Sequence, residues 1–276
     1  MGEKILYVSD LDGTLMRSNE AISDYTVRTI NELVEKGLNF TYATARSIES
    51  SKTVAGGLRL RFPVITRNGA VLADNTTGEH LEKSVFTEDE TELLKKLIPE
   101  LPRYGFVSCF FGEEMHRLYV DTEHSPEFSG YIEYHINNPT VRPVKGIDDL
   151  FDGIPGYVTL IGAKEEIEPI YEKARTYTGW ESLFQRDTYR EEYWLEICPQ
   201  NCTKAKTIKR LKERFGFDRL VVFGDGINDI PMFKEADEAY AVENALDELK
   251  QYATGVIGRN EEDAVAEFLK NRMEQS

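Results

Sequence analysis

A short acidic segment near the N-terminus carries the residue types best suited to chemistry. It reads Asp10-Leu11-Asp12-Gly13-Thr14-Leu15 and directly follows Ile5-Leu6-Tyr7-Val8, an apolar run that predicts a buried strand. Ligands of open parallel sheets bind at the carboxyl ends of strands. A carboxylate there can attack an electrophile and form a covalent intermediate, and a second carboxylate two positions on can carry the proton. Covalent catalysis by this pair is therefore the first hypothesis.

Two other interpretations compete for the same segment. Asp12-Gly13 could simply form an Asx-type turn. A calcium loop of the EF-hand type fits poorly, because counting from Asp10 puts Leu15 where that loop needs glycine and Ala21 where it needs glutamate.

A second acidic segment stands in the same relation to a strand. The apolar run 220–223 is followed by Gly224-Asp225-Gly226-Ile227-Asn228-Asp229. If this strand neighbours the first, Asp10, Asp225 and Asp229 converge, and carboxylates about 4 Å apart repel each other by a few kcal/mol, so the cluster needs a cation. Oxygen ligands without histidine favour Mg²⁺. For Asp229 a role as cap of the following helix stays open as an alternative.

The net charge makes local positive charge a requirement for any phosphate site. Lys and Arg number 33 against 49 Asp and Glu, which gives a net charge of −16. This field repels nucleic acid, anionic membranes and phosphorylated substrates alike. Lys204 starts a predicted helix, where the helix dipole disfavours a cation, and it could neutralise a phosphate and an attacking carboxylate together. Thr44 follows the predicted strand 40–43 and could donate a hydrogen bond to phosphate. A solvated lysine and a helix-capping threonine are the simpler alternatives.

Several other classes of protein are excluded or disfavoured. The four histidines lie outside these segments, so a Ser-His-Asp hydrolase or a histidine-ligated zinc site is not expected. Glycine-rich dinucleotide and Walker-type loops are absent from the sequence. No apolar run has the length of a membrane span, and no export signal is recognisable. Three cysteines without a Cys-x-x-Cys pair fit a reducing compartment, so we expect a cytoplasmic protein.

The order of predicted elements indicates two architectures. Strands alternate with helices in residues 1–85 and again in 189–276, which predicts an α/β core with a Rossmann-like parallel sheet and helices on both faces. Residues 86–188 contain closely spaced strands, near 106–111 and 116–121, which predict a mixed or antiparallel sheet with helices on one face. The sequence thus predicts a core domain interrupted by an inserted α/β cap domain of about 100 residues.

These segments together resemble the haloacid dehalogenase-like (HAD) phosphatases, and within them the Cof-type sugar-phosphatase branch. The branch inserts a large α/β cap between its second and third motifs, where residues 86–188 lie. Ala45 replaces the glycine usual in the branch, a departure that removes no catalytic atom. The motifs that carry the resemblance are Asp10-Leu11-Asp12-Gly13-Thr14, Thr44, Asn68-Gly69-Ala70, Lys204 and Gly224-Asp225-Gly226-Ile227-Asn228-Asp229.

The resemblance implies a role for each motif residue. Asp10 is expected to be the nucleophile, and Asp12 to protonate the leaving alcohol and later activate water. Mg²⁺ is expected to be held by Asp10, the backbone carbonyl of Asp12 and Asp225, with Asp229 close by. Phosphoryl transfer depends mostly on positioning and charge neutralisation, which such a set supplies. The residues expected to hold the transferring phosphoryl group are Thr44, Lys204 and Asn228.

The leading functional hypothesis is a Mg²⁺-dependent phosphomonoesterase that acts on a small, sugar-like phosphate through an aspartyl-phosphate, with no nucleic-acid or membrane partner. A phosphomutase shares this core and cap type and stays open as an alternative; stimulation by a bisphosphate without phosphate release would favour it. A non-catalytic phosphosugar sensor is a third reading, which the intact pair of Asp10 and Asp12 disfavours. The identity of the substrate and the oligomeric state stay open.

Overall fold

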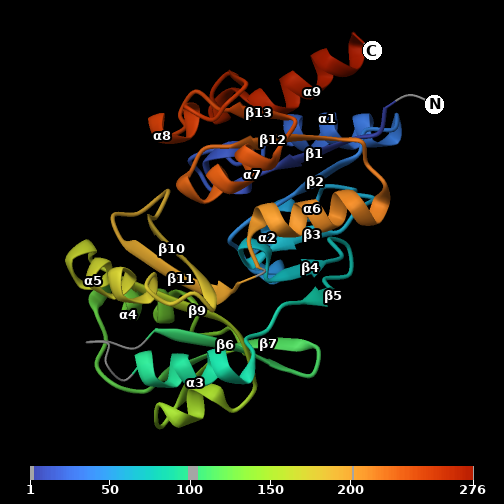
Figure 1. Ribbon diagram of the computed structural model, residues 1–276. Helices are drawn as coiled ribbons and strands as arrows, with labels where there is room; N and C mark the ends of the chain where they lie inside the picture. The colour runs from blue at the N-terminus through green and yellow to red at the C-terminus, as the bar shows by residue number, and fades with distance from the viewer. Residues whose placement is uncertain (1–2, 99–104, 201, 276) are drawn as a thin grey trace. The chain divides into compact units, whose positions relative to one another are not determined.

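The chain forms two compact units (Figure 1). This structure, a computed structural model, describes residues 3–98, 105–200 and 202–275. Met1–Glu82 and Thr203–Ser276 make the first unit, here called the core, and Lys83–Cys202 make the second, here called the cap. The cap begins within a few residues of the predicted position 86, but it ends at Cys202 rather than at 188, because strand β11 (Tyr193–Pro199) pairs with cap strands.

The core is built on a parallel sheet of five strands in the order β14-β13-β12-β1-β2. All four strand pairs are parallel, which confirms the predicted sheet type. The central strands are apolar on both faces because helices cover both faces of such a sheet. Its strands are β1 (Ile5–Ser9), β2 (Phe40–Tyr42), β12 (Arg219–Gly224), β13 (Glu238–Ala241) and β14 (Gly255–Val256).

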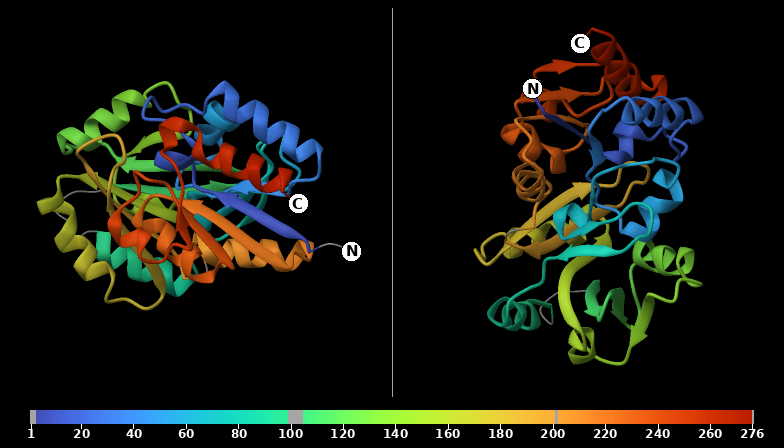
Figure 2. Two further views of the ribbon diagram at one scale, coloured as in Figure 1. Left: turned by 90° about the horizontal axis from the view of Figure 1, so that it is seen from above. Right: turned by 90° about the vertical axis from the view of Figure 1, so that its right-hand side faces the viewer.

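Helices cover both faces of the core sheet, as predicted. α1 packs against α9 on one face, and α6 packs against α7 on the other (Figure 2). Ser23, Ser47 and Thr203 cap α1, α2 and α6, each accepting a hydrogen bond from the backbone three residues on. The core helices are α1 (Asp24–Glu35), α2 (Ile48–Ala55), α6 (Lys204–Phe215), α7 (Ile230–Glu235), α8 (Asp247–Lys250) and α9 (Ala264–Glu274).

A small three-stranded sheet continues the edge of the core sheet. An isolated parallel bridge between Ala43 and Ile65 links it to the end of β2. The second and third of its strands along the chain are neighbours in this sheet. Its strands are β3 (Val64–Thr66), β4 (Val71–Ala73) and β5 (His80–Lys83).

The cap contains a six-stranded mixed sheet in the order β10-β11-β9-β6-β7-β8. Its pairs are antiparallel except β7 with β8, which is parallel. A mixed sheet in the inserted domain was predicted. Its strands are β6 (Phe106–Phe111), β7 (Glu114–Val120), β8 (Val141–Val144), β9 (Ile154–Gly162), β10 (Trp180–Arg186) and β11 (Tyr193–Pro199).

The cap helices lie on both faces of their sheet rather than on one. α3 (Glu88–Leu97) and α5 (Lys164–Ala174) share an apolar cluster with one face, which includes Val107. α4 (Pro126–Tyr134) packs through Phe128 on a separate cluster that includes Phe106. Because successive strand residues face opposite sides, α4 covers the other face. The sequence expectation missed this helix because it lies in a region of irregular pattern.

Two observations bear on the cellular setting. All three cysteines, Cys109, Cys198 and Cys202, are buried free thiols. Within the described residues, every helix is too short or too polar to cross a bilayer.

Candidate active site

The two acidic segments meet at one edge of the core sheet. β1 pairs with β12 from Ile5↔Arg219 to Ser9↔Phe223, so the loops that follow these strands start side by side. One carboxylate oxygen from each of Asp10, Asp225 and Asp229 lies within 4.8 Å of the others. The hypothesis that the two strands are neighbours is therefore confirmed.

Asp229 directs its carboxylate into this cluster. It stands at the start of α7 but makes no capping hydrogen bond to that helix. Its Oδ2 instead accepts hydrogen bonds from the backbone N–H of Asp225 (3.0 Å) and of Gly226 (3.1 Å). The helix-cap alternative for Asp229 is therefore wrong for α7, because the carboxylate closes the turn that precedes it.

Lys204 is the cation inside the cluster. Its Nζ lies 2.6 Å from Asp10 Oδ1 and 2.8 Å from Asp229 Oδ1. Its side chain is only 1% exposed, so the alternative of a solvated lysine is wrong. The unfavourable position at the first residue of α6 is explained, since two buried carboxylates compensate for the helix dipole.

The tight turn after Asp10 places the backbone of Gly13 close to the carboxylate of Asp225. Gly13 has φ +72°, and a Cβ built on it would lie 2.2 Å from Asp225 Oδ2. Thr14 Oγ1 donates a hydrogen bond to Asp225 Oδ1 (3.1 Å). A glycine is required here both for the left-handed backbone and for the close approach of the carboxylate.

Arg46 is a site residue that sequence reasoning missed. Its guanidinium holds Asp12 through Nε (2.9 Å to Oδ2) and Nη2 (2.6 Å to Oδ1), a bidentate pair of the strong type. Arg46 directly precedes Ser47, the cap of α2, where the helix dipole disfavours a cation. The signal that singled out Lys204 was thus present here too.

Thr44 and Asn228 stand at the same sheet edge with different partners. Thr44 is fully buried, and its Oγ1 accepts from the backbone N–H of Arg46 (3.1 Å). Asn228 Nδ2 donates to Asn68 Oδ1 (3.5 Å), and Asn68 N–H donates to the Thr44 carbonyl (3.0 Å). Among the described contacts, neither Thr44 nor Asn228 bonds to the aspartates, so their expected role is still a prediction.

The electrostatics of the cluster follow from its burial. The pKa of Asp10 is raised to about 8, chiefly by burial and in part by Asp229 and Asp12, while the Lys204 ammonium opposes the rise. Burial, together with Asp10 and Asp229, holds the pKa of Asp225 well above its usual range. Burial alone would lower the pKa of Lys204, but Asp10 and Asp229 keep it above its ordinary value. The cluster thus contains three carboxyl groups and one ammonium, so its acidic groups outnumber its basic group.

The donor set fits a divalent cation. Asp10, Asp225 and Asp229 offer only oxygen ligands, which Mg²⁺ prefers. Burial and the neighbouring carboxylates raise the pKa values of Asp10 and Asp225, and a bound cation would oppose this rise by favouring their ionised forms.

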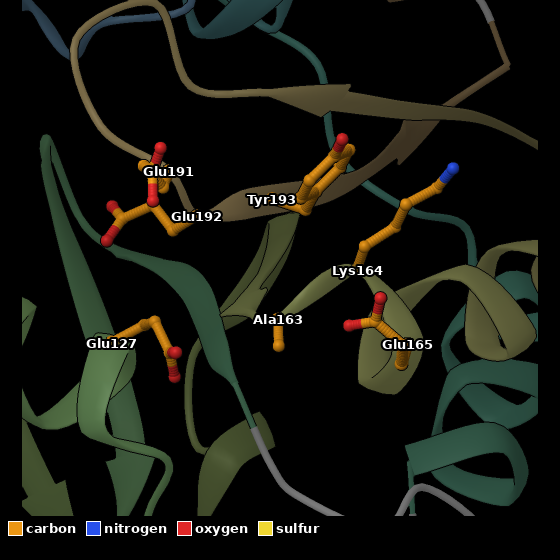
Figure 3. Close-up of a pocket in the computed structure, with 7 residues that line it drawn as sticks. All are labelled: Glu127, Ala163, Lys164, Glu165, Glu191, Glu192 and Tyr193. Atoms are coloured by element: carbon orange, nitrogen blue, oxygen red, sulfur yellow. The ribbon is translucent and has the colours of Figure 1, made fainter.

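A second group of carboxylates lines a hollow of about 420 Å³ within the cap (Figure 3). The hollow is sizeable, but its acidic side chains are spread around open space instead of converging on one point. Glu191, for example, has a side chain that is 97% exposed. Size alone therefore does not identify the reactive site. The lining residues are Glu127, Ala163, Lys164, Glu165, Glu191, Glu192 and Tyr193.

Comparisons with known proteins find similar chains over nearly the whole length. A family model for haloacid dehalogenase-like hydrolases matches residues 7–269. A 5-amino-6-(5-phospho-D-ribitylamino)uracil phosphatase of Bacillus subtilis is 28% identical over 96% of both chains. A haloacid dehalogenase-like hydrolase of Bacteroides thetaiotaomicron shares the fold with a TM-score of 0.76, 23% identity, and coverage of 98% of this chain and 99% of that one. A HAD subclass IIB sugar phosphatase shares it with a TM-score of 0.72, 20% identity, and coverage of 97% and 98%.

A parallel α/β core with an inserted α/β cap, and an aspartate cluster at the carboxyl edge of its sheet, define the class of this protein. The chain belongs to the haloacid dehalogenase-like hydrolases.

Proposed function

We propose that this phosphatase hydrolyses small phosphorylated metabolites, sugar phosphates among them, through an aspartyl-phosphate on Asp10 and with Mg²⁺ as cofactor. The observation that carries the proposal is that two carboxylates close together in the chain have different partners. Asp10 is buried against Lys204, and Asp12, two residues on, is held by Arg46 outside that cluster. Two carboxylates two residues apart that have different partners can take different roles, one as nucleophile and the other as general acid and base.

In the first step a carboxylate oxygen of Asp10 attacks phosphorus, and the bond from phosphorus to the ester oxygen breaks. Asp12 gives its proton to the leaving alcohol. In the second step Asp12 takes a proton from water, the water oxygen attacks phosphorus, and the bond to Asp10 breaks to release inorganic phosphate. Lys204, Thr44 and Asn228 would bind the phosphoryl oxygens throughout.

Mg²⁺ would be held by Asp10, Asp225 and the backbone carbonyl of Asp12, with Asp229 beside it. When bound, it supplies positive charge to the phosphoryl oxygens in both steps. The convergence of Asp10, Asp225 and Asp229 within 4.8 Å supports this assignment. The net charge of −16 supports it as well, since the chain as a whole repels a phosphorylated substrate.

The proposed substrate class rests on a relative. The phosphatase of Bacillus subtilis has a name that describes a phosphorylated ribityl chain, a small polyol phosphate. Such a substrate suits a reducing cytoplasm, the setting that we proposed from the three free thiols.

The experiment is a screen of small phosphate esters, scored by released inorganic phosphate, with Mg²⁺ and with EDTA. We expect turnover of sugar or polyol phosphates in Mg²⁺ and none in EDTA. Rapid acid quenching during turnover should trap one phosphoryl group on the peptide that contains Asp10. Activity that survives EDTA would remove the metal assignment, and an unlabelled peptide in a quenched burst would remove the covalent mechanism. Isomerised phosphosugar without free phosphate would identify a mutase instead.

A further inference from the structure

One turn of the core touches both acidic loops. Residues 242–246 follow β13 and lie between the loops that end β1 and β12. The N–H of Leu246 donates to the Asp225 carbonyl (2.9 Å). The side-chain Nδ2 of Asn244 donates to the Gly13 carbonyl (2.8 Å). Residues 242–246 thus form hydrogen bonds both to the loop that follows the expected nucleophile, Asp10, and to the loop that contains the expected metal ligand Asp225.

The amide of Asn244 is itself fixed in orientation. Its Oδ1 accepts a hydrogen bond from the N–H of Asn260 (3.1 Å), so its Nδ2 must point to Gly13. Asn260 in turn donates through Nδ2 to the Met16 carbonyl (2.9 Å). Two asparagines therefore hold the turn after Asp10, one at its middle and one at its end.

The sheet alone does not hold the acidic loops together. The parallel pairing of β1 with β12 ends at Ser9↔Phe223, and the last backbone bond between them runs from Asp10 N–H to the Phe223 carbonyl (2.9 Å). Beyond that point the loops contact each other at Gly13, where a Cβ would lie 2.2 Å from Asp225 Oδ2, and through the hydrogen bond from Thr14 Oγ1 to Asp225 Oδ1 (3.1 Å). A displacement of the Gly13 peptide would move the Asp12 carbonyl and Asp225 relative to each other.

We propose that Asn244 is a positioning residue that sets the affinity of the site for its divalent cation by anchoring the Gly13 carbonyl. The inference rests on the proposed function, because it presumes that Asp10, Asp225 and the Asp12 carbonyl hold Mg²⁺. Partners that orient metal ligands are commonly worth 10- to 100-fold in metal affinity or activity. We expect a loss of that order when the Asn244 amide is removed.

The test uses Asn244→Ala and the equal-sized Asn244→Leu, both full-length and stripped of metal. Mg²⁺ affinity is measured by isothermal titration calorimetry, and Tm is measured in EDTA. The matched control is Asn39→Ala, because Asn39 is also half-buried and its Nδ2 also donates to a backbone carbonyl, that of Ile5 (3.0 Å) at the start of β1.

The expected result is a 10- to 100-fold weaker Mg²⁺ affinity in both Asn244 variants and wild-type affinity in Asn39→Ala, with similar Tm changes in EDTA. Wild-type affinity in either folded Asn244 variant would overturn the inference while leaving the proposed function intact. Equal weakening in Asn39→Ala would overturn it too, since general loosening of β1 would then explain the loss. A wild-type protein that binds no Mg²⁺ would overturn the proposed function and this inference with it.

Discussion

The core and the cap each gather carboxylates, but those of the cap hollow are spread apart and, of them, Glu192 alone is buried. In the core, Asp10 and Asp229 have side chains that are 6% and 0% exposed, and they share one buried ammonium. In the cap, the carboxylate of Glu191 is in water and its ion pair with Arg186 is exposed on both sides. Exposed ion pairs of this kind contribute little to the stability of the fold. Buried charges, in contrast, are stable only when they are paired with an opposite charge or coordinate a metal. Burial and convergence therefore mark a reactive site better than the number of acidic groups does.

The largest effect should separate the two groups directly. We expect Asp10→Asn to lower phosphate release by about 10⁴-fold or more, because an amide cannot form the covalent intermediate. Glu191→Gln removes a carboxylate from the cap hollow and should leave turnover within about twofold, because surface substitutions rarely matter. Steady-state phosphate release measures both. If Glu191→Gln lowered phosphate release more than Asp10→Asn did, the core cluster would not be the reactive site.

Lys204→Met should have the next largest effect. It removes the ammonium that touches Asp10 and Asp229, and the loss of one charge-stabilising group commonly lowers kcat about 10²- to 10³-fold. Unfolding should also become easier by about 3–5 kcal/mol in metal-free protein, because two buried carboxylates lose their partner. Activity assays and urea denaturation test both parts. The control is Lys209→Met, an exposed lysine of the same helix, which should change neither.

Arg46→Ala should have an effect that depends on the leaving group. A misplaced Asp12 is expected to slow hydrolysis of an alkyl phosphate by about 10²-fold. An aryl phosphate such as p-nitrophenyl phosphate needs little proton donation and should suffer less. The ratio of kcat/KM for the two esters reports this difference, with Arg59→Ala, an exposed arginine, as control. An equal loss on both esters would assign Arg46 a structural role instead.

A further expected effect is a pH dependence of stability. The pKa of Asp10 lies at about 8 in the folded, metal-free protein and at its ordinary value of 3.8 when unfolded. Between these values the folded state binds more protons, so unfolding becomes easier as pH rises, by up to about 1.4 kcal/mol per pH unit. Urea denaturation in EDTA from pH 5 to 9 should reveal this slope, and it should be weaker in Asp10→Asn. Identical slopes in both proteins would contradict the raised pKa.

Much of this site could be predicted because the ends of short buried strands can be recognised in a sequence. The apolar runs before Asp10 and Asp225 are short and bounded, so their positions at strand ends followed from pattern alone. The helix-start position of Lys204 was informative because a lysine there conflicts with the dipole.

The remaining features depend on contacts between distant segments, which local pattern does not encode. Strand β11 resembles a core strand in composition, and only its pairing with β9 and β10 assigns it to the cap. Asn244 gives no local signal at all, because its role comes from a hydrogen bond to Gly13, 231 positions away. Arg46 was overlooked although its position carried the same conflict as that of Lys204.

The crowding at Gly13 has a consequence for reading natural variants of this chain. A single methyl group at that position would occupy the space of the Asp225 carboxylate while every polar side chain stayed in the sequence. A survey of related genes that scored only aspartates and lysines would count such a variant as competent. Glycine at position 13 is therefore as essential to this enzyme as its polar site residues, because alanine would not fit there.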